Sequence, residues 1–135
     1  MVETNLKSII SKKSIELGFD KIGFANPKEN IDPNKYFDKW IESKHHGTMQ
    51  WMESRKEERR DIFNYFPEVQ TVISLAFNYF TKRSSEFSKD YNSEVKFSNY
   101  AWGDDYHKII KNKLYDIKNE ILKHDPSIKI ILCVD

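Results

Sequence analysis

The segment YAWGDDYHK, residues 100–108, gathers tyrosine, tryptophan, aspartate, histidine and lysine side chains around one glycine. One interpretation is structural: Asp104 or Asp105 caps a following helix, Gly103 allows the turn, and the aromatic rings pack against a sheet. The other is functional. A glycine turn before a helix leaves backbone N–H groups and a positive dipole end that suit an anionic ligand, and a neighbouring Tyr–His pair adds hydrogen bonds. The residue types alone leave both interpretations open.

Two further segments carry polar chemistry in the middle of the chain. His45 and His46 are adjacent in HHGTMQWM, so on a helix they point about 100° apart and do not easily face one metal ion. The following run, ESRKEERRD, alternates basic and acidic residues, and its basic members are Arg55, Lys56, Arg59 and Arg60. Such a run is usually a solvated helical face, but one arginine turned into a cleft could bind a phosphate or carboxylate through two hydrogen bonds.

A third candidate is Asp135, which follows the apolar run IKIILCV. The carboxyl ends of buried strands border the ligand crevice of α/β sheets. A carboxylic acid that is partly desolvated there is a plausible proton donor. The alternative is a solvated aspartate that begins a turn.

The composition limits the classes of function. The 135 residues suit a single domain, and 22 basic against 21 acidic residues give a net charge of +1, so any nucleic-acid contact needs a local basic patch. No apolar stretch reaches the roughly 20 residues of a membrane span, and the charged N-terminus does not resemble a signal peptide, so we expect a cytoplasmic protein. One cysteine, Cys133, excludes an internal disulfide and any cluster held by cysteines of this chain alone.

The elements that position these residues follow from periodicity and from cap residues. We expect helices in 6–17, 32–44 and 104–124, strands in 19–25, 69–80 and 127–135, and a long loop in 81–98. The helix at 32–44 would begin with Asp32 as its N-cap and Pro33 in its first turn, and the apolar strand at 69–80 would be covered on both faces. This order predicts an α/β fold with helices flanking a short mixed sheet that is incomplete at its final edge. We therefore expect residues 1–135 to form one partial domain, the front part of a larger fold.

Three segments in this order resemble the N-terminal region of epoxyqueuosine reductase: LGFDKIGFA, HGTMQWM, and YAWGDDYHKIIKNKL followed by a strand that ends in VD. The resemblance covers almost the whole chain. It implies a cobalamin-dependent iron–sulfur oxidoreductase that converts epoxyqueuosine to queuosine in tRNA. It also implies that this chain is part of the α/β cobalamin-binding domain.

The same resemblance assigns roles to three residues. Asp135 is similar to the proton donor of the family and also lies at a cofactor contact. Arg59 resembles the arginine that contacts cobalamin, and Ser98 falls at another cofactor-contact position. The family also carries two 4Fe-4S clusters, which one cysteine cannot hold, so we expect this chain to be inactive alone. One alternative is that a separate chain supplies the missing part.

Two other functions stay open at this point. One is a different cobalamin-dependent reductase or a cobalamin-processing protein with the same domain. The other is not an enzyme: a cofactor- or RNA-binding module, or a partner of a second polypeptide that carries the clusters.

Overall fold

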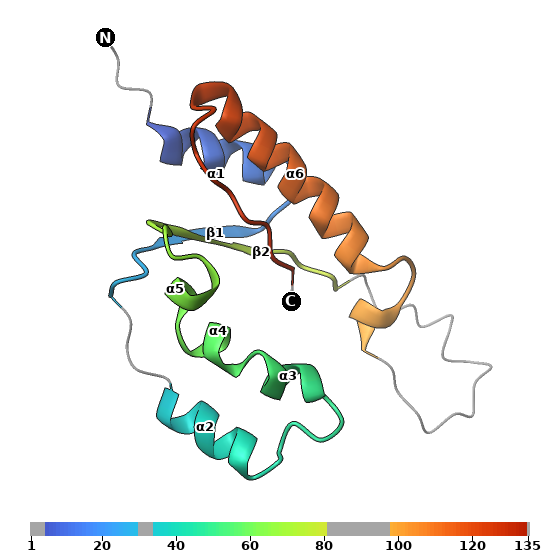
Figure 1. The fold of residues 1–135 in the computed structure, drawn as a ribbon. Helices are drawn as coiled ribbons and strands as arrows, with labels where there is room; N and C mark the ends of the chain where they lie inside the picture. Colours follow the sequence, from blue (N-terminus) through green and yellow to red (C-terminus); the bar gives the residue numbers. More distant parts are fainter. Residues whose placement is uncertain (1–4, 30–33, 81–97, 135) are drawn as a thin grey trace, which may run out of the picture. The chain divides into compact units, whose positions relative to one another are not determined.

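The computed structural model describes residues 5–29, 34–80 and 98–134 (Figure 1). The chain divides into two compact units: unit 1 comprises residues 1–22 and 75–135, and unit 2 comprises residues 23–74. The elements of the described part, in chain order, are α1 (Leu6–Glu16), β1 (Lys21–Ala25), α2 (Asn34–Glu42), α3 (Gln50–Ser54), α4 (Lys56–Arg60), α5 (Ile62–Tyr65), β2 (Val72–Ala76), the 3-10 turn η1 (Asn99–Ala101) and α6 (Tyr106–His124).

In unit 1, helix α1 ends at a glycine in the left-handed conformation. Gly18 has φ +86°, and its N–H donates to the Ile15 carbonyl, while the N–H of Phe19 donates to the Ser14 carbonyl. These two bonds form a Schellman motif, which satisfies carbonyl groups that the helix itself leaves without partners. The sequence predicted a helix in 6–17, and its end is therefore confirmed.

Helix α6 packs beside α1 and supplies much of the core of unit 1 (Figure 1). Its side chains Ile117 and Ile121 are buried, as are Ile10 of α1 and Phe19. Asp105 caps α6 by accepting a hydrogen bond from the backbone N–H of His107 at 3.0 Å. The predicted start of the helix at Asp104 or Asp105 and its end at His124 are confirmed.

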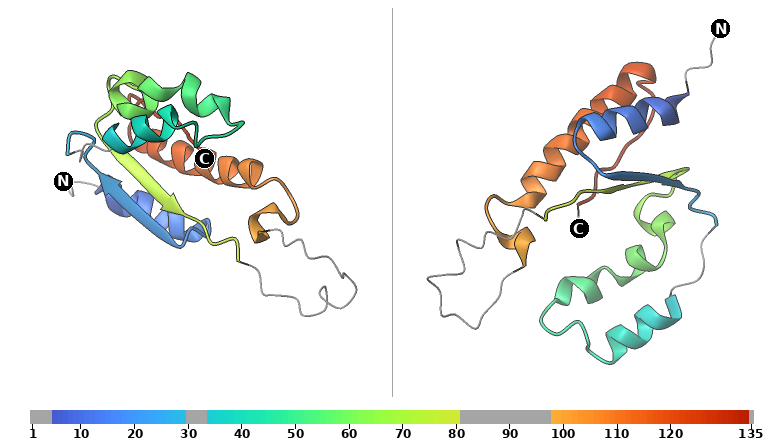
Figure 2. Two further views of the ribbon diagram at one scale, coloured as in Figure 1. Left: turned by 90° about the horizontal axis from the view of Figure 1, so that it is seen from below. Right: turned by 180° about the vertical axis from the view of Figure 1, so that it is seen from behind.

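The α/β class is also confirmed, with a sheet that is smaller than expected. Strands β1 and β2 form a two-stranded sheet and run antiparallel (Figure 2). Ile22 and Phe24 of β1 are half-buried between exposed neighbours, and the strand predicted at 19–25 is confirmed. In β2, by contrast, Ser74 and Ala76 are exposed, so the expectation of a strand covered on both faces is wrong for these residues.

The expected last strand, 127–135, is wrong over its described residues, 127–134. These residues form no strand, although Ile128, Ile130, Leu132 and Val134 are half-buried and the residues between them are exposed. The apolar alternation produces the side-chain pattern of an extended chain. A strand also needs a hydrogen-bonded neighbour, and the described sheet contains only β1 and β2.

The described part of unit 2 contains α2, α3, α4 and α5 and parts of both strands, and its buried side chains include Ile41, Val69 and His46. Helix α2 lies where the sequence predicted it, with Ile41 buried, but Tyr36 is 77% exposed and does not belong to its inner face. The expected capping residues Asp32 and Pro33 lie outside the described residues, as does the expected loop up to residue 97. In the part of the chain that is described, no helix has both the length and the apolar character that a bilayer crossing requires.

Candidate functional site

Arg59 and Arg60 are neighbours in α4, but their guanidinium groups have different surroundings. Arg60 donates to the Asp38 carboxylate of α2 through Nε at 2.9 Å and to Glu57 through Nη1 at 3.0 Å. The hydrogen bond to Asp38 is the main reason why the pKa of Arg60 is raised. This network joins α2 to α4, so Arg60 serves the structure of unit 2.

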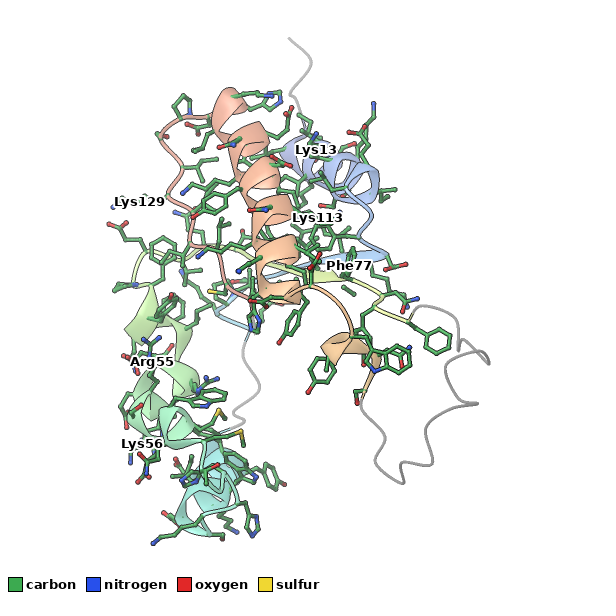
Figure 3. The ribbon with its side chains drawn as sticks, turned by 90° about the vertical axis from the view of Figure 1, so that its right-hand side faces the viewer. Lys13, Arg55, Lys56, Phe77, Lys113 and Lys129 are labelled. Atoms are coloured by element: carbon green, nitrogen blue, oxygen red, sulfur yellow. The ribbon has the colours of Figure 1, made fainter. Side chains whose placement is uncertain are left out.

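Arg59, in contrast, is exposed, and its guanidinium carbon lies 5.0 Å from the centre of the Trp51 ring. Trp51 belongs to α3 and is 54% exposed. This cation–π contact leaves the N–H groups at the edge of the guanidinium accessible. The other two basic residues of the run, Arg55 and Lys56, are also exposed (Figure 3).

The two histidines of unit 2, His45 and His46, also have different surroundings. His45 is exposed, whereas His46 is buried, with its Nε2 atom 3.6 Å from a Glu53 carboxylate oxygen and its ring 5.9 Å from that of Trp40. Within the ranges 5–29, 34–80 and 98–134, no group of three or more His, Cys, Asp or Glu residues could hold a metal ion. His46 therefore has the surroundings of a core residue in this unit.

In unit 1, aromatic rings of the segment YAWGDDYHK form a partly exposed cluster together with Tyr79. Tyr100 makes edge-to-face contacts with Tyr79 and with Tyr106, each at 6.0 Å between ring centres, and Tyr106 stacks on His107 at 4.1 Å. Tyr79 is 55% exposed and Tyr100 is 50% exposed. We call Tyr79, Tyr100, Tyr106 and His107 the aromatic cluster.

The structure supports part of each interpretation of this segment. Asp105 caps α6, and Gly103 forms the turn with φ +86°, as the structural interpretation requires. Trp102, however, is 49% exposed, so the expectation that it packs against the sheet is wrong. The exposed rings are instead available to a ligand.

One carboxylate oxygen of Asp105 also orients the ring of His107. It lies 2.9 Å from Nδ1 of His107 while it accepts the backbone N–H of the same residue. The hydrogen bond to the side chain of His107 is the largest cause of the lowered pKa of Asp105. With Nδ1 engaged by the carboxylate, the Nε2 atom is the imidazole nitrogen that remains for other partners.

The sequence analysis did not identify Tyr79 or Trp51 as exposed residues: Tyr79 lies in the segment 69–80, which it predicted as a covered strand, and Trp51 was given no role. Tyr79 follows Asn78, whose backbone N–H donates to an Asp20 carboxylate oxygen at 2.7 Å. The side-chain oxygen of Asn78 accepts the N–H of Phe80 at 2.9 Å. This turn ends the strand before Tyr79, and the Asn within the apolar run is the signal that could have indicated it.

The candidate residues are distributed as follows. Ser98 precedes η1 in unit 1, is exposed, and makes no capping hydrogen bond to that turn through its hydroxyl. Arg59 belongs to unit 2, and Asp135 lies outside the described residues. A hollow of about 290 Å³ lies against α1 and α6, and one of about 530 Å³ lies in unit 2 beside Phe63; neither is lined by Arg59 or Ser98.

Residues 59–135 match the family model "Epoxyqueuosine reductase QueG, DUF1730". An epoxyqueuosine reductase of Prochlorococcus marinus (strain NATL2A) is 32% identical over 134 residues, which are 97% of this chain and 41% of the relative. That of Atelocyanobacterium thalassa is 38% identical over 107 residues, 78% of this chain and 33% of the relative. The solved structure of epoxyqueuosine reductase from Streptococcus thermophilus has a TM-score of 0.62 at 26% identity and covers 92% of this chain and 33% of that one. The chain thus spans 33–41% of the length of these relatives.

Proposed function

Because the chain belongs to the epoxyqueuosine reductase family, we propose that it forms the N-terminal part of such an enzyme, which reduces epoxyqueuosine to queuosine in tRNA in the cytoplasm. The observation that carries this proposal is the exposure of the aromatic cluster. A helix cap and its turn need no exposed rings, whereas a wall that receives a large cofactor or a nucleobase does. Tyr79 and Tyr100 of this cluster keep about half of their surface open to such a ligand.

The proposed cofactor is cobalamin, and the donor groups of this chain fit its periphery. Amide side chains and a phosphate surround the corrin ring, and they form hydrogen bonds with guanidinium and hydroxyl groups. Arg59 and Ser98 are exposed, and neither the Trp51 contact nor η1 occupies their polar atoms fully. We propose that these two residues, together with Asp135, contact the cofactor.

The reaction defines the role of Asp135. Removal of the epoxide oxygen as water, with formation of a carbon–carbon double bond, consumes two electrons and two protons. Cobalamin, when bound, supplies the reducing chemistry. The Asp135 carboxylic acid would donate a proton to the departing oxygen, which makes that oxygen a better leaving group.

The 4Fe-4S clusters do not fit this chain, because each needs about four cysteine thiolates and the sequence contains only Cys133. Electron delivery therefore requires a partner that carries the cluster motifs, either a further part of the protein or a separate polypeptide. The second proposed partner is the tRNA that bears the epoxyqueuosine nucleoside.

The test has two stages. Hydroxocobalamin is first titrated into the purified chain, and binding is followed in the visible spectrum of the corrin. The chain is then combined with a polypeptide that carries the cluster motifs, a chemical reductant and tRNA containing epoxyqueuosine. The nucleosides of the digested tRNA are analysed by mass spectrometry.

We expect cobalamin to bind and queuosine to form. Asp135→Asn should bind cobalamin and form no queuosine, whereas Asp116→Asn, a change on the exposed side of α6, should leave both unchanged. Queuosine formation by Asp135→Asn at the normal rate would refute the role of Asp135. Binding without any conversion of the tRNA would favour a cobalamin-processing protein.

A further inference from the structure

The contact between Trp51 and Arg59 links two short helices that are adjacent in unit 2. Trp51 lies in α3 and Arg59 in α4, with the guanidinium carbon 5.0 Å from the centre of the indole ring. An exposed arginine normally samples many rotamers, and fixing one of them on binding reduces affinity. A ring that already holds the guanidinium removes part of this cost.

The neighbouring arginine shows why this contact matters. Arg60 is held by two carboxylates, those of Asp38 and Glu57, which occupy its N–H groups. The face of a ring holds a guanidinium in a different way, because it attracts the charge without accepting the in-plane N–H groups. Trp51 therefore fixes Arg59 while its hydrogen-bond donors stay available.

We propose that Trp51 is a positioning residue, which orients the Arg59 guanidinium for hydrogen bonds to the amide or phosphate groups of the corrinoid. This inference rests on the proposed function, because it takes Arg59 as a contact to cobalamin. Trp51 itself acts through Arg59. Its effect should therefore disappear when the guanidinium is removed.

The test is the dissociation constant of hydroxocobalamin, measured by visible spectroscopy on the whole chain. Trp51→Leu should weaken binding about two- to five-fold, the size expected for an exposed cation–π contact. Trp51→Phe, which keeps an aromatic face, should recover most of the loss. Tyr36→Leu is the matched control, because Tyr36 is an exposed aromatic residue of the same unit.

A double-mutant cycle separates positioning from a direct contact of Trp51 with the cofactor. In an Arg59→Ala background, Trp51→Leu should cause no further loss of affinity. An equal loss in both backgrounds would overturn the inference, because Trp51 would then act independently of Arg59. Equal affinities for Trp51→Leu and Tyr36→Leu would overturn it as well.

A second measurement needs no cofactor. The ring current of Trp51 should shift the NMR resonance of the Arg59 Nε–H group, and this shift should vanish in Trp51→Leu and persist in Tyr36→Leu. The absence of the shift in the unaltered chain would refute the inference while leaving the proposed function intact. A chain that shows the shift but binds no cobalamin would refute the proposed function, and with it the role of Trp51 in cofactor binding.

Discussion

Lys113 of α6 ties the end of α1 to the core of unit 1, and its replacement tests how that unit is held together. Its Nζ atom donates a hydrogen bond to the Leu17 carbonyl and lies 5.4 Å from the centre of the Phe77 ring (Figure 3). Leu17 is the C-cap residue that follows the last residue of α1, so its carbonyl lies at the negative end of the helix dipole. Lys113→Met keeps an unbranched apolar side chain and removes the charge and the donor.

The expected loss follows from the two contacts. A hydrogen bond from a charged donor contributes about 1.5–3 kcal/mol, and an exposed cation–π contact contributes about 0.5–1 kcal/mol. Lys113 is only half-buried, so solvent weakens both, and Met keeps part of the packing on the ring. We therefore expect the free energy of unfolding to fall by about 2 kcal/mol.

Urea denaturation followed by circular dichroism measures this loss. With an m-value near 2 kcal/mol per molar urea, the midpoint should fall by about 1 M. The matched control is Lys111→Met on the same helix, since Lys111 is exposed and is not seen to bond to any of the described residues. Equal midpoints for the two variants would refute the role that we assign to Lys113.

Three further predictions concern local features. Gly18→Ala should lower the free energy of unfolding by about 1–2 kcal/mol, because φ of Gly18 is +86°. Gly23 has open space around it, so Gly23→Ala should lower the free energy of unfolding much less. The pKa of Asp105 is lowered in the folded chain, mainly by the hydrogen bond to the side chain of His107. The ionised Asp105 carboxylate therefore stabilises the folded state at pH values above the unfolded pKa of about 3.9. This stabilisation is lost as the pH falls through the lower folded pKa. The melting temperature of Asp105→Asn should therefore fall less than that of the unaltered chain on acidification; an equal fall contradicts this. Cys133 is exposed, so it should react with a thiol reagent in the native state as fast as in urea; protection would indicate a buried segment.

The sequence alone determined the features that depend on neighbouring residues. The end of α1 follows from Gly18, since a left-handed residue suits glycine whatever surrounds the helix. The start of α6 follows from Asp105, whose side chain bonds to a residue two positions later. The order of helices and strands and the family resemblance rest on the same kind of local pattern.

The tertiary structure alone decided which side chains remain available to a ligand. Arg59 and Arg60 are adjacent residues of the same type, and the hydrogen bond from Arg60 to Asp38 joins residues 22 positions apart, which the sequence does not indicate. Likewise, the alternation in residues 128–134 predicts a strand, but this segment is not part of the described sheet, which consists of β1 and β2. Hydrogen bonds and burial between distant segments depend on how the whole chain folds, and a local pattern does not contain that information.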